Sequence, residues 1–101
     1  MSDRVTIRIA HPEDAPALVR LAELDSARVP PGRLLVAEVE GELWAAVSLE
    51  APAGIADPFR RSAELLLLLH ERARQLERAG RARSRVRSRW RALAAVARRA
   101  G

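Results

Sequence analysis

The sequence contains no cysteine and no lysine, and only 3% of its residues are aromatic. Without cysteine the chain has no disulfide, no thiolate nucleophile and no zinc–thiolate site. All eighteen basic residues are arginine, for which a GC-rich genome is a simpler explanation than selection for guanidinium chemistry. The aromatic residues are Trp44, Phe59 and Trp90, so we expect an aliphatic core and modest stability.

Long apolar runs are also absent. The longest, from Leu65 to Leu69, falls far short of the roughly 20 residues needed to cross a bilayer. The N-terminus is acidic and polar and gives no sign of a signal peptide, so we expect a cytoplasmic protein. A length of 101 residues leaves room for one small domain and little else.

Charge is distributed unevenly along the chain. Residues 1–80 hold ten arginines and thirteen acidic residues, a net charge of −3, whereas residues 81–101 hold eight arginines and no acid, a net charge of +8. This asymmetry predicts a mildly acidic domain over residues 1–80 and a basic tail over residues 81–101.

Alternating apolar residues predict the strands. The first covers residues 5–10, and a hairpin of two more covers residues 34–39 and 43–50, with a tight turn at Glu40-Gly41. A short fourth strand is expected at residues 54–56. In the third strand, period-two alternation places four side chains on one face: Leu43, Ala45, Val47 and Leu49.

Helical periodicity predicts two helices, over residues 13–24 and residues 62–79. Pro12 suits the start of the first helix, Asp57 and Ser62 are start signals for the second, and Gly80 is a stop signal. The second helix has an apolar face, widened by Leu66 and Leu68, that consists of Leu65, Leu69, Ala73 and Leu76. The predicted fold is therefore α+β, a small antiparallel sheet of three or four strands in β-α-β-β-(β)-α order, packed by two helices.

The tail has arginine at every odd position from 81 to 91. Wound as a helix, it has one narrow apolar stripe, formed by Ala82, Val86, Trp90, Leu93 and Ala97. Its arginines repel one another and its apolar area is small, so we expect a disordered or marginally helical segment.

Three segments, Ile7 to Ala10, Pro12 to Ala15 and Val36 to Glu42, occur here in an order that resembles the N-terminal half of the GNAT acetyltransferase superfamily. The resemblance covers about residues 4–56, and the chain also looks like short actinobacterial proteins of unassigned function. It implies a fourth strand that leads into a glycine-rich loop, where backbone amides and a helix N-terminus hold the pyrophosphate of acetyl-CoA.

That loop is replaced in this sequence. Arg60, Arg61, Ser62 and Ala63 stand in its place, no glycine occurs from Phe59 to Ala79, and the later strands of the family have no counterpart. We therefore assign no catalytic residue and no cofactor, and predict a non-catalytic GNAT-like interaction domain. The alternative is an acetyl-CoA-dependent acetyltransferase fragment that completes its site with a partner chain or by dimerisation. An open strand edge also makes a homodimer a reasonable hypothesis.

Several residues in the domain are candidate sites. Arg60 and Arg61 precede a helix and could hold an anion, but we favour a solvated first turn capped by Asp57. The two histidines, His11 and His70, have neither metal-ligand spacing nor an evident partner, so structural or surface roles are expected.

Other polar and aromatic residues are given structural roles as well. We expect a solvated hairpin for the three strand glutamates, Glu38, Glu40 and Glu42, rather than a catalytic set. Trp44 is expected on a sheet face or at a dimer contact.

The tail is the strongest functional candidate. Six arginines without an acid among them are predicted to attract nucleic acid or another anionic surface: Arg81, Arg83, Arg85, Arg87, Arg89 and Arg91. Trp90 is positioned to stack on a base or to anchor at a lipid interface. The alternative interpretation is a solubilising, disordered end shaped by codon bias.

Overall fold

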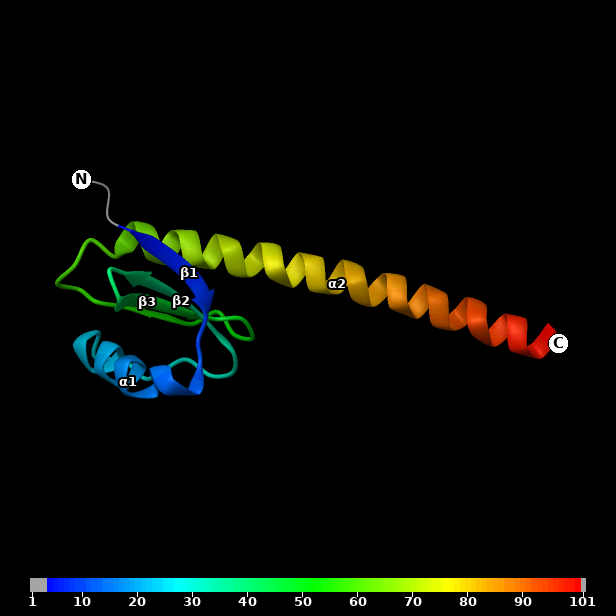
Figure 1. Cartoon of the computed structure of the whole chain (residues 1–101), viewed down its shortest axis with the longest axis horizontal. Helices are drawn as coiled ribbons and strands as arrows, with labels where there is room; N and C mark the ends of the chain where they lie inside the picture. Colours follow the sequence, from blue (N-terminus) through cyan, green and yellow to red (C-terminus); the bar gives the residue numbers. More distant parts are fainter. Residues whose placement is uncertain (1–3, 101) are drawn as a thin grey trace.

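The computed structural model describes residues 4–100, with the side chains of residues 4–96. Its elements follow the predicted order and confirm the α+β class (Figure 1). The strands are β1 (Val5–Ile9), β2 (Leu34–Val39), β3 (Glu42–Ser48) and β4 (Gly54–Ala56). A short 3₁₀ turn, η1 (Pro12–Asp14), leads into α1 (Ala15–Leu24), and the long helix α2 (Ala63–Ala100) follows the sheet.

The sheet has four strands in the order β1-β2-β3-β4, and every neighbouring pair is antiparallel. The predicted tight turn joins β2 to β3: Glu40 and Gly41 both have positive φ angles, 50° and 85°. Two central residues with positive φ are typical of a type I′ hairpin turn, whose twist matches that of the flanking strands. The short fourth strand predicted at residues 54–56 is also present.

The pairing of β2 with β3 is interrupted at Trp44. Ala37 pairs with Ala45, but the next residue of β2, Glu38, pairs with Leu43, so Trp44 is an extra residue in β3. Such a bulge shifts the alternation of side chains by one position. Leu43 therefore packs against the core on the α1 side, and the prediction that it shares a face with Ala45 is wrong.

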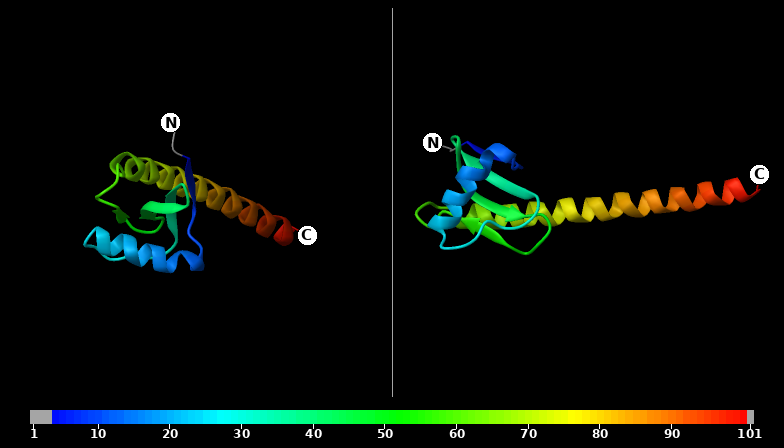
Figure 2. Two further views of the ribbon diagram at one scale, coloured as in Figure 1. Left: turned by 60° about the vertical axis from the view of Figure 1, so that its left-hand side comes forward. Right: turned by 90° about the horizontal axis from the view of Figure 1, so that it is seen from below.

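Helices cover both faces of the sheet (Figure 2). The core between the sheet and α1 is formed by Leu18, Leu21, Ala22, Leu34, Val36, Ala46 and Ile55. The core between the sheet and α2 is formed by Leu35, Ala37, Ala45, Val47 and Leu69, with Leu65, Leu66 and Ala73 packed around it. At about 25 cal/mol per Å² of buried apolar surface, these two aliphatic layers are the main stabilising contribution to the fold.

Helix α2 continues far beyond the sheet (Figure 1). It passes through Gly80 without a break, so the predicted helix end at Gly80 is wrong. Glycine lowers helix propensity by about 1 kcal/mol relative to alanine but does not block the backbone hydrogen bonds. The 38 residues of α2 give the molecule its longest dimension, 64 Å, and every residue from 74 to 94 is exposed. Residues 81–100 are thus a helical extension of the domain, where the sequence predicted a disordered or marginally helical tail.

Candidate functional site

Residues 81–100 form the projecting part of α2. They carry the arginines that the sequence singled out. All six, from Arg81 to Arg91, are exposed. Arg81 pairs with Glu77 at 3.6 Å, and the Nε of Arg83 donates a hydrogen bond of 3.4 Å to the Ala79 carbonyl oxygen. Within the described part of the chain the other four have no ion pair with a carboxylate. Their charge is therefore open to an external anion.

Helical geometry sorts these arginines onto two sides of α2. Successive residues are about 100° apart around a helix, so residues two positions apart are separated by about 200°. Arginine at every second position therefore alternates between two ridges. The first arginine ridge is Arg81, Arg85 and Arg89; the second arginine ridge is Arg83, Arg87 and Arg91. Each ridge has the i, i+4 spacing that makes side chains neighbours, so each is a continuous row of positive charge.

Arg60 lies in the segment before α2, where its charge is already balanced. Its guanidinium group is 3.2 Å from a carboxylate oxygen of Glu42 and 3.9 Å from one of Asp57, and it lies 5.3 Å from the centroid of the Trp44 ring. Arg61 is exposed on the same turn. These contacts favour the solvated turn over an anion site at Arg60.

The backbone amides of this turn are also engaged within the turn itself. The Phe59 amide donates to Oδ1 of Asp57 at 2.8 Å, and the Arg60 amide donates to the Asp57 carbonyl oxygen at 3.3 Å. The Ser62 amide donates to the Arg60 carbonyl oxygen, and the Ser62 hydroxyl donates to the Asp57 carbonyl oxygen. A pyrophosphate cradle needs free amides at this point of the chain. The amides of Phe59, Arg60 and Ser62 are thus already bonded within the turn, which leaves fewer amides there to hold a pyrophosphate.

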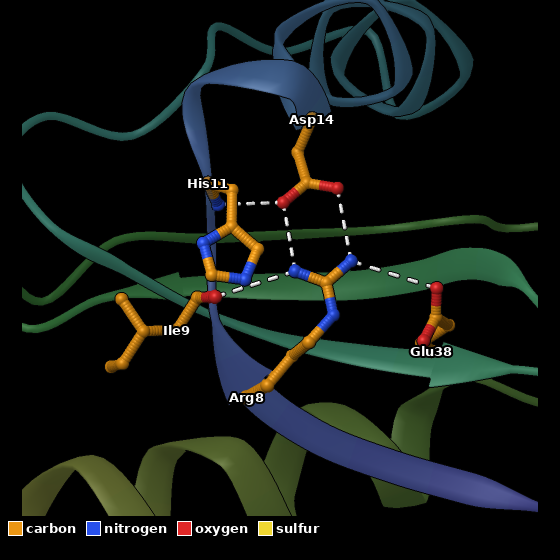
Figure 3. Close-up of polar contacts among 5 residues, drawn as sticks. All are labelled: Arg8, Ile9, His11, Asp14 and Glu38. Carbon is orange, nitrogen blue, oxygen red and sulfur yellow. Dashed lines mark hydrogen bonds and ion pairs between the residues drawn. The ribbon is translucent and has the colours of Figure 1, made fainter.

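We call residues 4–62, which precede α2, the sheet domain. Its most extensive polar network centres on Arg8 (Figure 3). Arg8 donates two hydrogen bonds to the carboxylate of Asp14, at 2.8 and 2.9 Å, and its guanidinium group lies 3.5 Å from Glu38. The backbone amide of His11 also donates to Asp14, at 2.6 Å. The hydrogen bonds from Arg8, followed by that from His11, lower the pKa of Asp14 to about 2. The same pairing raises the pKa of Arg8 above its ordinary value.

This network was not found from the sequence, although part of its signal was there. Asp14 follows His11 by three residues, the spacing at which an acidic side chain reaches back to the amide at a helix start. Arg8, however, reaches Asp14 only because the chain reverses between β1 and α1. The network joins β1, η1 and β2 through charges that satisfy one another, so its role is structural.

Trp44 is half-buried at the bulge, with its indole N–H enclosed and without a hydrogen-bond partner among the described residues. Its carbonyl oxygen accepts the Asp57 amide at 2.9 Å, and Arg60 covers its ring. Trp44 thus lies at an irregular position of β3, where the bulge joins the hairpin to the turn before α2, and its assignment to a sheet face or a dimer contact stays a prediction.

The remaining candidates are dispersed. His11 is exposed at the turn after β1, and Glu40 is exposed in the hairpin turn. His70 is half-buried and lines a cavity of about 530 Å³ between α2 and the β3–β4 connection. Charged side chains of both signs surround that cavity, so it has no single electrostatic preference.

Two kinds of site are absent from the described residues. No group of three or more histidine, cysteine or acidic side chains is arranged to hold a metal ion there. None of the helices there is both apolar and long enough to traverse a bilayer. Comparisons with protein-family models, with curated proteins and with solved structures found no match.

Proposed function

We propose that this protein is a non-catalytic binding domain that attaches to polyanions through the projecting part of α2. The sheet domain, which resembles half of a GNAT fold, is the scaffold that carries this helix. The proposal rests on one observation: the arginines from Arg85 to Arg91 are exposed on a helix and have no ion pair within the described residues.

The two parts of the chain differ in how many acidic residues accompany their arginines, which supports this proposal. In the sheet domain and the first turns of α2, the guanidinium groups of Arg8, Arg60 and Arg74 lie within ion-pair distance of a carboxylate. Residues 81–101 contain no acidic residue at all. Binding of a polyanion by these unbalanced arginines would release its counterions, which is a strong driving force at low salt.

The helix itself also favours a binding role. Most of the stability of a helix in a protein comes from tertiary packing, which the exposed residues 74–94 lack, and like charges four residues apart destabilise a helix further. Here the charged stretch is wound as a continuation of a helix whose first turns are fixed against the sheet through Leu65 and Leu69. A polyanion lying along it would neutralise the repulsion and stabilise the helical form.

Heparin affinity chromatography of the full chain tests the proposal. We expect retention at low salt and elution on a salt gradient, together with a higher melting temperature in the presence of heparin. Flow-through of the full chain at low ionic strength would rule out polyanion binding.

The second candidate function is an acetyltransferase fragment that completes its site with a partner chain. The strand and helix order, which follows the one that the resemblance implies, favours it. The internally bonded turn at Asp57 weighs against it, because the amides of Phe59, Arg60 and Ser62 are engaged within the turn. Acetyl-CoA raising the melting temperature, with no effect of free acetate, would favour this second function.

A further inference from the structure

The projecting part of α2 also exposes large apolar side chains. Val86, Trp90 and Leu93 are 52%, 68% and 61% exposed. Together with Ala82 they recur at intervals of four, four and three residues, which places them along one side of a helix. We call these four residues the apolar stripe. Presentation of charge alone does not require a tryptophan and two aliphatic side chains in one line, so the apolar stripe needs a separate explanation.

The apolar stripe runs between the two arginine ridges. At about 100° per residue, each ridge is centred about 100° from the middle of the stripe, one on either side. The side opposite the stripe holds small residues, Ser84 and Ser88. This projecting part of α2 therefore has an apolar front, two cationic flanks and a small polar back.

We propose that this face of α2 lies on an anionic lipid surface, with Trp90 and Leu93 inserted at the level of the headgroups. The proposal rests on the polyanion-binding function and names its ligand. An interfacial helix of this kind combines tryptophan and leucine on one face with arginines that reach lipid phosphates from both sides. Tryptophan suits that depth because its ring is apolar and its N–H can still reach water or a headgroup.

Charge complementarity selects this occupant over a second copy of the chain. Pairing two copies along the apolar stripe would bring both arginine ridges of one helix against those of the other. The two copies would then have no acidic residue between 81 and 96 to compensate them. An anionic surface supplies the missing negative charge along the whole helix.

The apolar stripe also favours a lipid surface over a nucleic acid as the ligand of this helix. Phosphate binding by arginine needs charge but not apolar area, and a duplex contacted through both ridges would leave Val86 and Leu93 in water. A lipid surface buries the stripe and binds the ridges at the same time. Leu68, five helical turns before Val86 and 45% exposed, lies on the same line of α2, with Arg72 and Gln75 between it and the apolar stripe.

The test uses the full chain with vesicles of equal parts phosphatidylglycerol and phosphatidylcholine, and with vesicles of phosphatidylcholine alone. We expect binding to the first kind only, with a blue shift of tryptophan emission and quenching by brominated lipid. The Trp90→Phe variant assigns the signal, because Trp44 remains as the background. Substituting Val86→Ser together with Leu93→Ser should weaken vesicle binding about tenfold or more, because the apolar contribution is lost.

A matched pair of substitutions on the back of the helix provides the control. Ser84→Ala together with Ser88→Ala should leave vesicle binding unchanged, and circular dichroism checks that both double variants keep their helix. Retention on heparin should be the same for all three proteins.

Three outcomes separate the proposals. Vesicle binding that depends on Val86 and Leu93, with unchanged heparin retention, supports the lipid surface. Heparin retention with no blue shift, or with equal vesicle binding by wild type and the Val86→Ser, Leu93→Ser variant, overturns the lipid surface and leaves polyanion binding standing. Absence of binding to heparin and to anionic vesicles at low salt overturns both.

Discussion

Arg8 and Asp14 form a two-point ion pair, at 2.8 and 2.9 Å, that ties β1 to the turn before α1. Both side chains are largely shielded, with 25% and 15% of their surface exposed. Parallel hydrogen bonds of this kind are stronger than a single contact and fix the relative orientation of the two groups. The pair therefore fixes the position of β1 relative to the start of α1, the helix that covers one face of the sheet.

The pair predicts a stability loss in acid. The pKa of Asp14 is about 2 in the folded protein and near its ordinary value of 3.8 in the unfolded chain, so unfolding takes up a proton between these values. The stabilisation is fully present above about pH 5 and is lost as the pH falls from about 4 to 2. Urea unfolding as a function of pH measures it.

Asp14→Asn is the matching variant. We expect it to lower the free energy of unfolding at pH 7 by about 1–2 kcal/mol and to flatten the acid dependence. Equal stability of wild type and variant at pH 7 would show that the pair contributes nothing net.

Gly54→Ala tests the close approach of β4 to its neighbours. An added Cβ would lie 3.0 Å from Val47 and 3.1 Å from both the Ala46 carbonyl oxygen and Leu66. Because the backbone oxygen cannot move aside easily, we expect a loss of about 1–3 kcal/mol in thermal or urea unfolding. An unchanged melting temperature would mean that β4 and α2 are not packed as described.

Gly80→Ala is the opposite case. Gly80 has open space around it and lies within α2, so alanine meets no atom and has the better helix propensity. We expect more helical ellipticity at 222 nm and a gain of about 0.5–1 kcal/mol in helix stability. No gain in ellipticity would restore the helix end at Gly80 that the sequence predicted.

The exposed edge of β1 predicts self-association through this strand. The Ala10 amide donates to the Leu34 carbonyl oxygen, and the Glu40 amide donates to the Arg4 carbonyl oxygen. The backbone N–H and C=O groups of the even-numbered residues of β1 therefore point toward β2. The amides of Val5 and Ile9 consequently point away, and both side chains are partly exposed, at 44% and 39%. We expect a homodimer at micromolar concentration that Val5→Pro dissociates. A monomeric wild type in sedimentation would exclude it.

Local patterns in the sequence predicted most of the sheet domain. Alternation and turn chemistry located the two strands of the hairpin and its turn at Glu40-Gly41, because both depend on neighbouring residues. The bulge at Trp44 was missed, since it depends on pairing across strands rather than on local sequence. The end of α2 was misplaced because a single glycine is a weak stop when the helix before it is held by packing.

The candidate site was predictable to a similar degree. The arginines and Trp90 could be singled out by charge and composition, but their division into two ridges depends on the helix that the sequence left open. The sequence already favoured a solvated turn over an anion site at Arg60, but the ion pair with Glu42 was not predictable, because the two residues are 18 positions apart in the chain. The ion pair of Arg8 with Asp14 likewise depends on the chain reversal after β1.

The salt dependence of binding tests the central claim most directly. Affinity of the full chain for a duplex oligonucleotide or heparin is measured over a range of salt, beside a variant with Arg85, Arg87, Arg89 and Arg91 changed to glutamine. A control variant carries the same charge change at exposed arginines of the sheet domain, Arg4, Arg20, Arg28 and Arg33. We predict that the helix variant lowers the slope of log affinity against log salt by about 2 to 4, whereas the control leaves the slope within about 1 of wild type. Equal slopes for the two variants, or no binding by the wild type at low salt, would contradict polyanion binding by α2.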